Sequence, residues 1–339
     1  MAVITVPRIL WFTYETNILL TREPNLFYQN VLHTIEAYNN SWSGTIHESK
    51  DKNDFQVRFL DDTECSEIVQ EAYSALSVYF AQETNGAFRG DICRAAALYL
   101  HGGYYFDVDM EVIKAYVVQD RFVPLSHLIT HQDPISNLSV VEPSIFVSAL
   151  NADRNRIFQS FIATTAYNPI LRNSFEKMMD FYEGRNLDCT PMNDCLMGTA
   201  TMLLAYEQHI QEQFTQQQHH EDSDNNTATW NGYNTSSVMD FDTSITLFGS
   251  YLLLEDKLIP ELYPDFPRRP GVDNFYCNYV VHDPTTKEIY FYSRIVGSKN
   301  CPYLGDKPPP LSSTVPEILD LEQFAQVMEA NVSVLSALD

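Results

Sequence analysis

The chain has 339 residues, of which 45% are apolar, so it can bury a sizeable core in one large domain or in one domain with additions. It carries 45 acidic and 21 basic residues, which gives a net charge of −24. Nucleic acids and anionic membranes attract lysine and arginine, so this balance argues against both as partners. Most of the acidic residues are interpreted as a solvated surface.

Neither a membrane segment nor a metal-binding cysteine pattern is found. No window of about 18 apolar residues is present, so no transmembrane helix is predicted. The opening residues (MAVITVP) lack the basic and long apolar parts of a signal peptide. The six cysteines form no CxxC pair, which argues against zinc, and their even number permits up to three disulfides without indicating any.

In the amino-terminal half, hydrophobic periodicity predicts alternating strands and helices. Residues 3–13 (VITVPRILWFT) predict a buried strand with a proline near its start. Residues 61–63 (DDT) predict a turn that caps the helix after it. Further strands are predicted at residues 55–60, 104–108 and 111–118, and helices at residues 25–38, 66–82 and 90–101. Two glycines, Gly102 and Gly103, are expected to end the last of these helices.

The carboxy-terminal half gives a looser pattern. Helices are predicted at residues 156–165, 170–182 and 194–213, a strand hairpin at residues 278–293, and an apolar run of undetermined type at residues 140–149. Residues 216–237 are polar and of low complexity, which predicts a mobile surface insertion. Residues 301–339 are interpreted as a proline-rich connector followed by a terminal helix, so the main domain is expected to span residues 1–300.

The most informative pattern is a pair of aspartates, Asp107 and Asp109, at the end of an aromatic strand. Two carboxylates spaced by two residues point the same way on a strand, and at its end they can converge on one hard cation. Upstream, Asp91 and Arg94 lie on one helical face because they are three residues apart. Together these residues predict a site for a metal-bound diphosphate and a polyhydroxylated group. Taken separately, they would fit an acidic structural turn and a surface salt bridge.

The order Asp91-x-x-Arg94, Gly102-Gly103-x-Tyr105-x-Asp107-x-Asp109 resembles the DXD-containing sugar transferases. That family includes initiating mannosyltransferases, α-1,4-galactosyltransferases and the glucosyltransferase domains of clostridial toxins. The resemblance implies an α/β fold of the GT-A type with a mostly parallel central sheet. It also implies retaining transfer of a hexose from a UDP- or GDP-sugar to a glycan or protein acceptor. The chain is expected to be soluble and cytoplasmic, with the Golgi lumen as the alternative if an anchor has been removed.

The resemblance assigns roles to individual residues. Asp109 is expected to ligate Mn²⁺ or Mg²⁺ directly, and Asp107 to hold ribose or sugar hydroxyls and to reach the metal. Asp91 and Arg94 are expected to bind hydroxyls of the donor sugar. Gly103 is expected beside the donor.

Two further positions each keep an alternative. Trp11 stands where the family's opening segment has a histidine, so it is expected either to stack on the donor or to fill the core. His282 ends an apolar strand (NYVVH) and is similar in position to a carboxy-terminal histidine of the family. It is expected either to be the third metal ligand or to be a core or edge histidine.

The sequence is also compatible with two other functions. One is a catalytically degenerate module that binds a sugar nucleotide or a glycan. The altered Trp11, Thr199 in place of the family's proline, and the missing carboxy-terminal Trp favour this alternative, whereas the intact motif argues against it. The other is a phosphatase with the first aspartate as nucleophile, which Met110 and Glu111 do not fit because that reaction wants Thr or Gly soon after the acids.

Overall fold

A computed structural model of the chain describes residues 2–21, 26–43, 55–118, 121–123, 129–132, 139–142, 144–150, 156–185, 197–221, 251–258, 278–283 and 288–294. All of these residues belong to one compact unit, Met1–Phe266 with Asn274–Pro302. The expected connector and terminal helix at residues 301–339 lie outside the described residues.

The described residues form strands and helices that alternate over the first half of the chain. The strands are β1 Ala2–Ile4, β2 Ile9–Thr13, β3 Gln56–Leu60, β4 Gly103–Phe106, β5 Met110–Val112, β6 Arg121–Val123, β7 Ile129–Gln132, β8 Ser139–Glu142, β9 Phe146–Leu150, β10 Ile157–Thr164, β11 Tyr251–Leu258, β12 Asn278–His282 and β13 Ile289–Arg294. The helices are α1 Ile18–Thr21, α2 Leu26–Ser43, α3 Asp62–Ala72, α4 Ser74–Gln82, α5 Gly86–His101, α6 Pro169–Tyr182 and α7 Met197–Glu221. None of these helices is long and apolar enough to cross a membrane.

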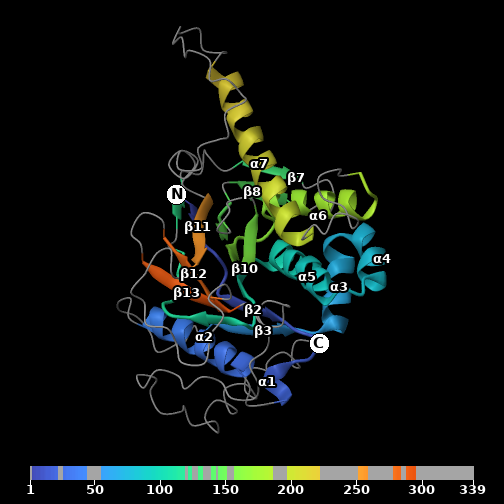
Figure 1. Cartoon of the computed structure of the whole chain (residues 1–339). Helices are drawn as coiled ribbons and strands as arrows, with labels where there is room; N and C mark the ends of the chain where they lie inside the picture. The colour runs from blue at the N-terminus through green and yellow to red at the C-terminus, as the bar shows by residue number, and fades with distance from the viewer. Residues whose placement is uncertain are drawn as a thin grey trace, which may run out of the picture. The chain divides into compact units, whose positions relative to one another are not determined.

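The centre of the unit is a nine-stranded sheet of order β3-β2-β4-β10-β9-β11-β12-β13-β5 (Figure 1). The pairings of β2 with β3, β2 with β4 and β9 with β11 are parallel, and the other five are antiparallel. Followed across the sheet, these pairings give six of the nine strands one direction, while β10, β12 and β5 run the opposite way. The expected α/β class is therefore confirmed, with the antiparallel strands supplied by short connections such as that between β12 and β13.

Helices cover both faces of the sheet, and strand β4 shows why (Figure 1). Successive side chains of a strand point to opposite faces. Tyr104 and Phe106 pack against Tyr38 of α2, with ring centroids 5.4 and 5.3 Å apart. Tyr105, between them, faces the other way and belongs to the core formed with α5, α6 and α7. Because both faces are covered, β4 is apolar or aromatic throughout and all four of its residues are buried.

Two predicted elements are each divided into two. The predicted strand at residues 3–13 is β1 and β2, because Pro7 lacks an N–H for a sheet and its carbonyl instead accepts a turn bond from the Ile9 N–H at 2.8 Å. The predicted helix at residues 66–82 is α3 and α4. It breaks at Tyr73, which has φ −155° and ψ 86°, and the Tyr73 ring stacks on Phe175 of α6 at 5.4 Å.

The prediction of a helix at residues 156–165 is wrong, since this segment is strand β10 in the middle of the sheet. A strand buried on both faces does not alternate apolar and polar residues, so its pattern can mimic a buried helix. The predicted helix at residues 194–213 is α7, which continues to Glu221. The start of the expected insertion at residues 216–237 is therefore helical, and the part beyond residue 221 lies outside the described residues.

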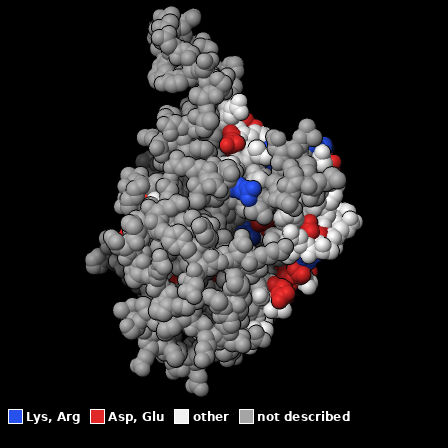
Figure 2. Space-filling model, viewed as in Figure 1, with Lys and Arg blue, Asp and Glu red and all other residues white. Residues whose placement is uncertain are grey.

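Helix α3 begins as its sequence predicts. The Asp61 carboxylate accepts hydrogen bonds from the N–H groups of Thr63 at 2.9 Å and Glu64 at 3.1 Å, and the Glu64 carboxylate accepts from the Asp61 N–H. This reciprocal pair is a capping box. Figure 2 shows acidic side chains gathered at this end of α3, where the helix dipole favours negative charge.

A disulfide between Cys65 and Cys93 joins α3 to α5 and closes a segment with a sequence separation of 28 residues. Both cysteines are buried. Cys93 lies between Asp91 and Arg94 on the same helix, so the cross-link fixes the helix that carries the predicted sugar-binding pair.

Replacing both cysteines, Cys65→Ala with Cys93→Ala, should lower the free energy of unfolding by about 3 kcal/mol, because the open chain regains loop entropy in the unfolded state. Urea unfolding of the double variant beside the oxidised protein measures the difference. Equal midpoints and equal slopes for the two proteins would contradict the prediction.

Candidate functional site

The turn between α5 and β4 places the motif residues. Asn85 caps the start of α5 by accepting a hydrogen bond from the Ala87 N–H at 3.0 Å. Gly102 ends the helix at φ 65° and Gly103 follows at φ 110°, a region that L side chains rarely adopt. A Cβ on Gly102 would also lie 2.7 Å from the Ala166 nitrogen. The chain therefore reverses within two residues and runs back along α5, so the end of β4 meets the first half of the helix.

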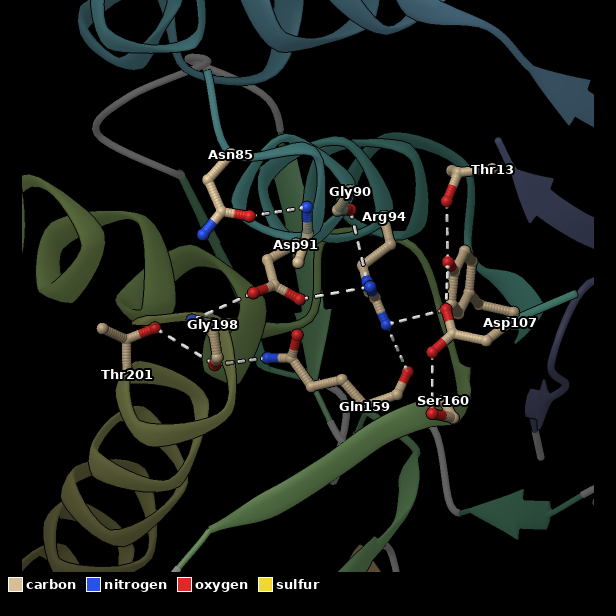
Figure 3. Close-up of polar contacts among 12 residues, drawn as sticks. Thr13, Asn85, Gly90, Asp91, Arg94, Asp107, Gln159, Ser160, Gly198 and Thr201 are labelled. Carbon is tan, nitrogen blue, oxygen red and sulfur yellow. Dashed lines mark hydrogen bonds and ion pairs between the residues drawn. The ribbon is translucent and has the colours of Figure 1, made fainter. Parts of the chain in front are cut away.

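Arg94 lies at the centre of the site and is 7% exposed (Figure 3). Its Nη2 is 3.2 Å from Oδ1 of Asp91, and its Nη1 is 3.1 Å from Oδ1 of Asp107. The same Nη1 donates to the carbonyl of Gln159 at 3.0 Å, and Nε donates to the carbonyl of Gly90 at 3.2 Å. The guanidinium is thus held by two hydrogen bonds to backbone carbonyls and by two ion pairs, and Asp91 is the only partner of Nη2 among the described residues.

Asp107 is held by donors on both of its oxygens. Oδ1 accepts from the Tyr105 hydroxyl at 2.7 Å as well as from Arg94, and Oδ2 accepts from the Ser160 hydroxyl at 2.7 Å. The Tyr105 oxygen is also 2.7 Å from the Thr13 hydroxyl, and Thr13 is the donor there because the Tyr105 proton goes to Asp107. With Oδ1 filled, Oδ2 keeps one lone pair for a ligand, and the side chain is 27% exposed.

Asp91 is buried against the beginning of α7. Its Oδ2 accepts a hydrogen bond from the Gly198 N–H at 3.2 Å (Figure 3). A Cβ on Gly198 would overlap the Asp91 carboxyl group, so this position accepts only glycine. This contact explains why the chain keeps the glycine of the resembling element. The pair formed by Asp91 and Arg94 is buried and is not a surface salt bridge.

Asp109 differs from Asp107 in having a buried oxygen, Oδ1, that accepts no hydrogen bond within the described part of the chain. The turn before it is fixed by Asn30 of α2, whose amide donates to the Val108 carbonyl at 3.1 Å. A buried carboxylate oxygen without a donor is costly, and a cation is the partner that such an oxygen prefers.

The electrostatics of the site follow from burial and from the sharing of one cation. Burial raises the pKa of Asp91 to about 6, because the charge of Arg94 only partly offsets the desolvation and Asp107 repels the second negative charge. Burial and the neighbouring Asp107 raise the pKa of Asp109 to about 8. Two of the three carboxylates pair with one guanidinium and the third has no ion pair among the described residues, so a bound diphosphate would meet a negative site unless a cation accompanied it.

Trp11 and Gly103 are not brought to these acids. Trp11 is 3% exposed, donates from Nε1 to the Gly102 carbonyl at 2.8 Å and stacks on His101 at 5.6 Å. A Cβ on Gly103 would lie 2.7 Å from the Ile9 carbonyl and 2.9 Å from Trp11 Nε1. Trp11 pairs with Tyr105, but its indole reaches back to the amino end of β4, where Gly103 also lies, whereas Asp107 follows the other end of the strand. Trp11 therefore fills the core, which was the second of its two expected roles. Gly103 is required by the tight turn before β4.

Strand register does not bring His282, the expected third metal ligand, beside Asp109. Strand β13 lies between β5 and β12. Its residue Ser293 pairs with Met110 of β5 on one side and with Tyr279 of β12 on the other. His282 pairs with Ile289, further along β13. His282 thus lies three residues further along β12, roughly 10 Å at the usual rise of a strand, and two strands away from Asp109. The ring is buried and its Nδ1 is 3.0 Å from the Asp283 carbonyl. Among the described residues, no cluster of three or more His, Cys, Asp or Glu side chains could hold a metal.

The sequence reasoning did not identify four residues that hold the site. Thr13 and Asn30 carried no motif, although Thr13 ends a predicted strand and therefore stands at its carboxyl edge. Gln159 and Ser160 were assigned to a helix. Recognising β10 as a strand would have placed these two residues near the site.

Comparison with known proteins agrees with this geometry. Residues 29–131, which include the four motif residues, match the family described as the glycosyltransferase sugar-binding region containing the DXD motif. No curated protein matches the chain. The structure is similar to that of the PaToxG glycosyltransferase, with 15% identity over 65% of this chain and 75% of that chain and a TM-score of 0.39. It is similar also to the bacterial N-acetylglucosamine transferase NleB, with 11% identity over 52% of this chain and 80% of that chain and a TM-score of 0.24. These structural scores are too low to carry an argument.

The raised pKa of Asp91 predicts how stability depends on pH. Between about pH 4 and pH 6 the folded protein holds a proton on Asp91 that the unfolded chain has lost, so the free energy of unfolding of the metal-free protein should fall as pH rises through this window. Asp91→Asn should remove a fall of up to about 3 kcal/mol. Urea unfolding at several pH values measures both slopes, and identical slopes for the two proteins would contradict the assignment.

Proposed function

We propose that the chain is a glycosyltransferase that transfers a hexose from a UDP- or GDP-sugar to a glycan or protein acceptor, with a divalent cation and with retention of configuration. The match of residues 29–131 to the sugar-binding region that contains the DXD motif supports this proposal. The observation that carries this proposal is the convergence of Asp91 and Asp107 on the Arg94 guanidinium, beside Asp109, whose buried Oδ1 accepts no hydrogen bond from the described residues. The proposal includes a GT-A type of fold and a catalytic domain over residues 1–300.

Asp109 fits the role of principal metal ligand. Its buried Oδ1 accepts no hydrogen bond from the described residues and burial raises its pKa, so the ionised carboxylate lacks a partner for its charge there. Mn²⁺ or Mg²⁺ suits carboxylate oxygens, and Mg²⁺ is commonly held by one or two carboxylates together with phosphates of the substrate. When bound, such an ion would stabilise the negative charge that develops on the leaving diphosphate. The protein would then need no cluster of three ligands.

Asp107 is suited to a hydroxyl of the donor. Its Oδ1 is occupied by Tyr105 and Arg94, and only Oδ2 has room for one more donor or for the ion. Fixed on both sides, the carboxylate would orient the ribose or the sugar without moving to meet it.

The Asp91 and Arg94 pair is suited to the sugar ring. Nη2 of Arg94 has one partner among the described residues, Asp91, and each Asp91 oxygen has lone-pair capacity beyond the one contact shown for it. A hydroxyl that bridges this donor and acceptor would be held in one orientation, and a sugar lacking it would leave a buried donor without a partner.

Chelation tests the metal requirement. Hydrolysis of UDP- and GDP-sugars should stop in excess EDTA and return with Mn²⁺, and Asp109→Asn should lower the restored rate by at least about a hundredfold. The same variant should unfold at an equal or higher temperature without metal, because it removes a buried acid that is costly to ionise and whose Oδ1 accepts no hydrogen bond from the described residues.

Asp62→Asn, an exposed carboxylate on α3, is the control for a general loss of charge and should keep the metal-restored rate. Full hydrolysis in EDTA would sink the metal-dependent mechanism. Tight binding of a donor without hydrolysis would support the degenerate binding module instead.

The sugar contact can be separated from the diphosphate contact with Arg94→Lys. Lysine keeps the positive charge between Asp91 and Asp107 but loses the planar fork. Transfer should fall by more than about tenfold, while the affinity for the bare nucleoside diphosphate should change by less than about threefold, because the pair contacts only the sugar.

Calorimetric titration with the diphosphate and with a non-hydrolysed donor analogue gives both affinities. Arg89→Lys is the matched control, since Arg89 lies on the same helix and pairs at the surface with Asp62 at 3.1 Å. Equal losses of affinity for the diphosphate and for the analogue would remove the sugar-binding role.

A further inference from the structure

Strand β10 carries an irregularity next to the site. In its pairing with β9 the register shifts between Phe158, which pairs with Ala149, and Ala163, which pairs with Val147. Four residues of β10, 159–162, therefore stand opposite the single residue Ser148 of β9. The buried Ser148 hydroxyl donates to the Phe161 carbonyl at 2.9 Å within this bulge. Such bulges often re-aim side chains beside active sites.

The bulge takes Gln159 and Ser160 out of both neighbouring ladders. On the other edge of β10, the paired register with β4 begins only at Phe161, opposite Phe106. Ser160 stands opposite Asp107, the first residue after β4, and every hydrogen-bond partner found for Gln159 and Ser160 among the described residues belongs to the proposed site.

Gln159 joins Arg94 to the beginning of α7. Its carbonyl accepts from Nη1 of Arg94 at 3.0 Å, and its side-chain amide donates to the carbonyl of Gly198. The N–H of the same Gly198 donates to Asp91. The Thr201 hydroxyl also donates to the Gly198 carbonyl, at 3.2 Å (Figure 3).

Ser160 holds Asp107 twice. Its carbonyl accepts from the Asp107 N–H at 3.0 Å, and its hydroxyl donates to Oδ2 of Asp107 at 2.7 Å. One hydrogen bond fixes the backbone where β4 ends, and the other fixes the rotation of the carboxylate.

We propose that Gln159 and Ser160 form a positioning clamp for sugar transfer, in which Ser160 aims the Asp107 carboxylate and Gln159 holds Gly198 against Asp91. The inference rests on the proposed function and deepens it. Neither side chain is assigned contact with substrate. The clamp acts through Asp107 and Asp91, and the bulge in β10 is what makes it possible.

The environment of Gln159 allows a positioning role to be separated from a stabilising one. Its side chain is 2% exposed, and Oε1 has no hydrogen-bond partner among the described residues. Gln159→Met keeps the length of the side chain, removes this unsatisfied acceptor and loses the donor to Gly198. It should therefore leave the unfolding temperature unchanged or raised, while transfer falls on the order of tenfold. A parallel loss of stability and activity, or unchanged activity, would overturn the role of Gln159.

A double-mutant cycle tests Ser160. Ser160→Ala should lower kcat/KM for the donor about 10- to 100-fold, as expected when a positioned group is released, and Ser160→Thr should restore most of it because the hydroxyl is kept. In an Asp107→Asn background Ser160→Ala should have little further effect, since both changes remove the same function. Additive losses in the cycle would overturn the inference.

The control is Ser174→Ala, which removes a buried serine hydroxyl that donates to the Leu171 carbonyl at 2.7 Å in α6. It should keep kcat and KM. If the wild type hydrolyses a donor and Ser160→Ala is as active as Ser174→Ala, the clamp is wrong and the proposed function stands. If the wild type binds a donor without turnover, the same cycle is measured on the donor dissociation constant. If the wild type neither binds nor hydrolyses any donor, both proposals fail.

Discussion

One buried guanidinium holds the site and its surroundings together. Arg94 of α5 bonds to Asp91 on its own helix, to Asp107 after β4 and to the backbone of β10. Removing a guanidinium from water is costly, and the cost is offset only when all of these acceptors are in place. Docking of α5 on the sheet and assembly of the site are therefore the same event. A helix shifted by one turn would leave a buried cation facing no carboxylate.

The two aspartates of the motif are given different tasks by their surroundings. Asp107 is bound by Tyr105, Ser160 and Arg94, so it is rigid and retains little free capacity. The buried Oδ1 of Asp109 accepts no hydrogen bond from the described residues, and burial raises the pKa of this acid to about 8. Two acids in such different environments are typical of sites in which one acid binds the substrate and the other stabilises charge. In the proposed enzyme the first acid orients the donor, and the second holds the cation that a diphosphate needs near three carboxylates.

Close packing enforces this arrangement from several directions. Gly198 brings the start of α7 against Asp91 without a side chain between them, and the disulfide at Cys93 ties the same helix to α3. Asn30 reaches from the opposite face of the sheet to hold the turn between the two aspartates. The site is thus supported by α2, α3, α7 and β10, whereas its chemical groups come from α5 and the end of β4. Mutations that are distant from the acids in the sequence can for this reason change the orientation of their carboxylates.

The sequence by itself determined the elements that local chemistry specifies. The capping box at Asp61, the glycine turn after α5 and the spacing of the two aspartates are short-range signals, and the structure has all three. Periodicity also identified α2, α6 and the hairpin of β12 and β13. The family resemblance also implied that Asp91 and Arg94 lie beside the aspartates.

Tertiary structure decided everything that depends on register between distant strands. Strand β10 has apolar residues on both faces and therefore no alternation to distinguish it from a helix, so Gln159 and Ser160 were misplaced with it. His282 has the right chemistry and ends a strand of the expected kind, but the pairing of β12 with β13 places it opposite Ile289 and not beside Asp109. Trp11 stands on the correct strand and faces the glycine turn instead of the acids. Residue type and spacing define which groups a chain can offer, but which of them meet depends on strand pairing, because one residue of register moves a side chain to the other face.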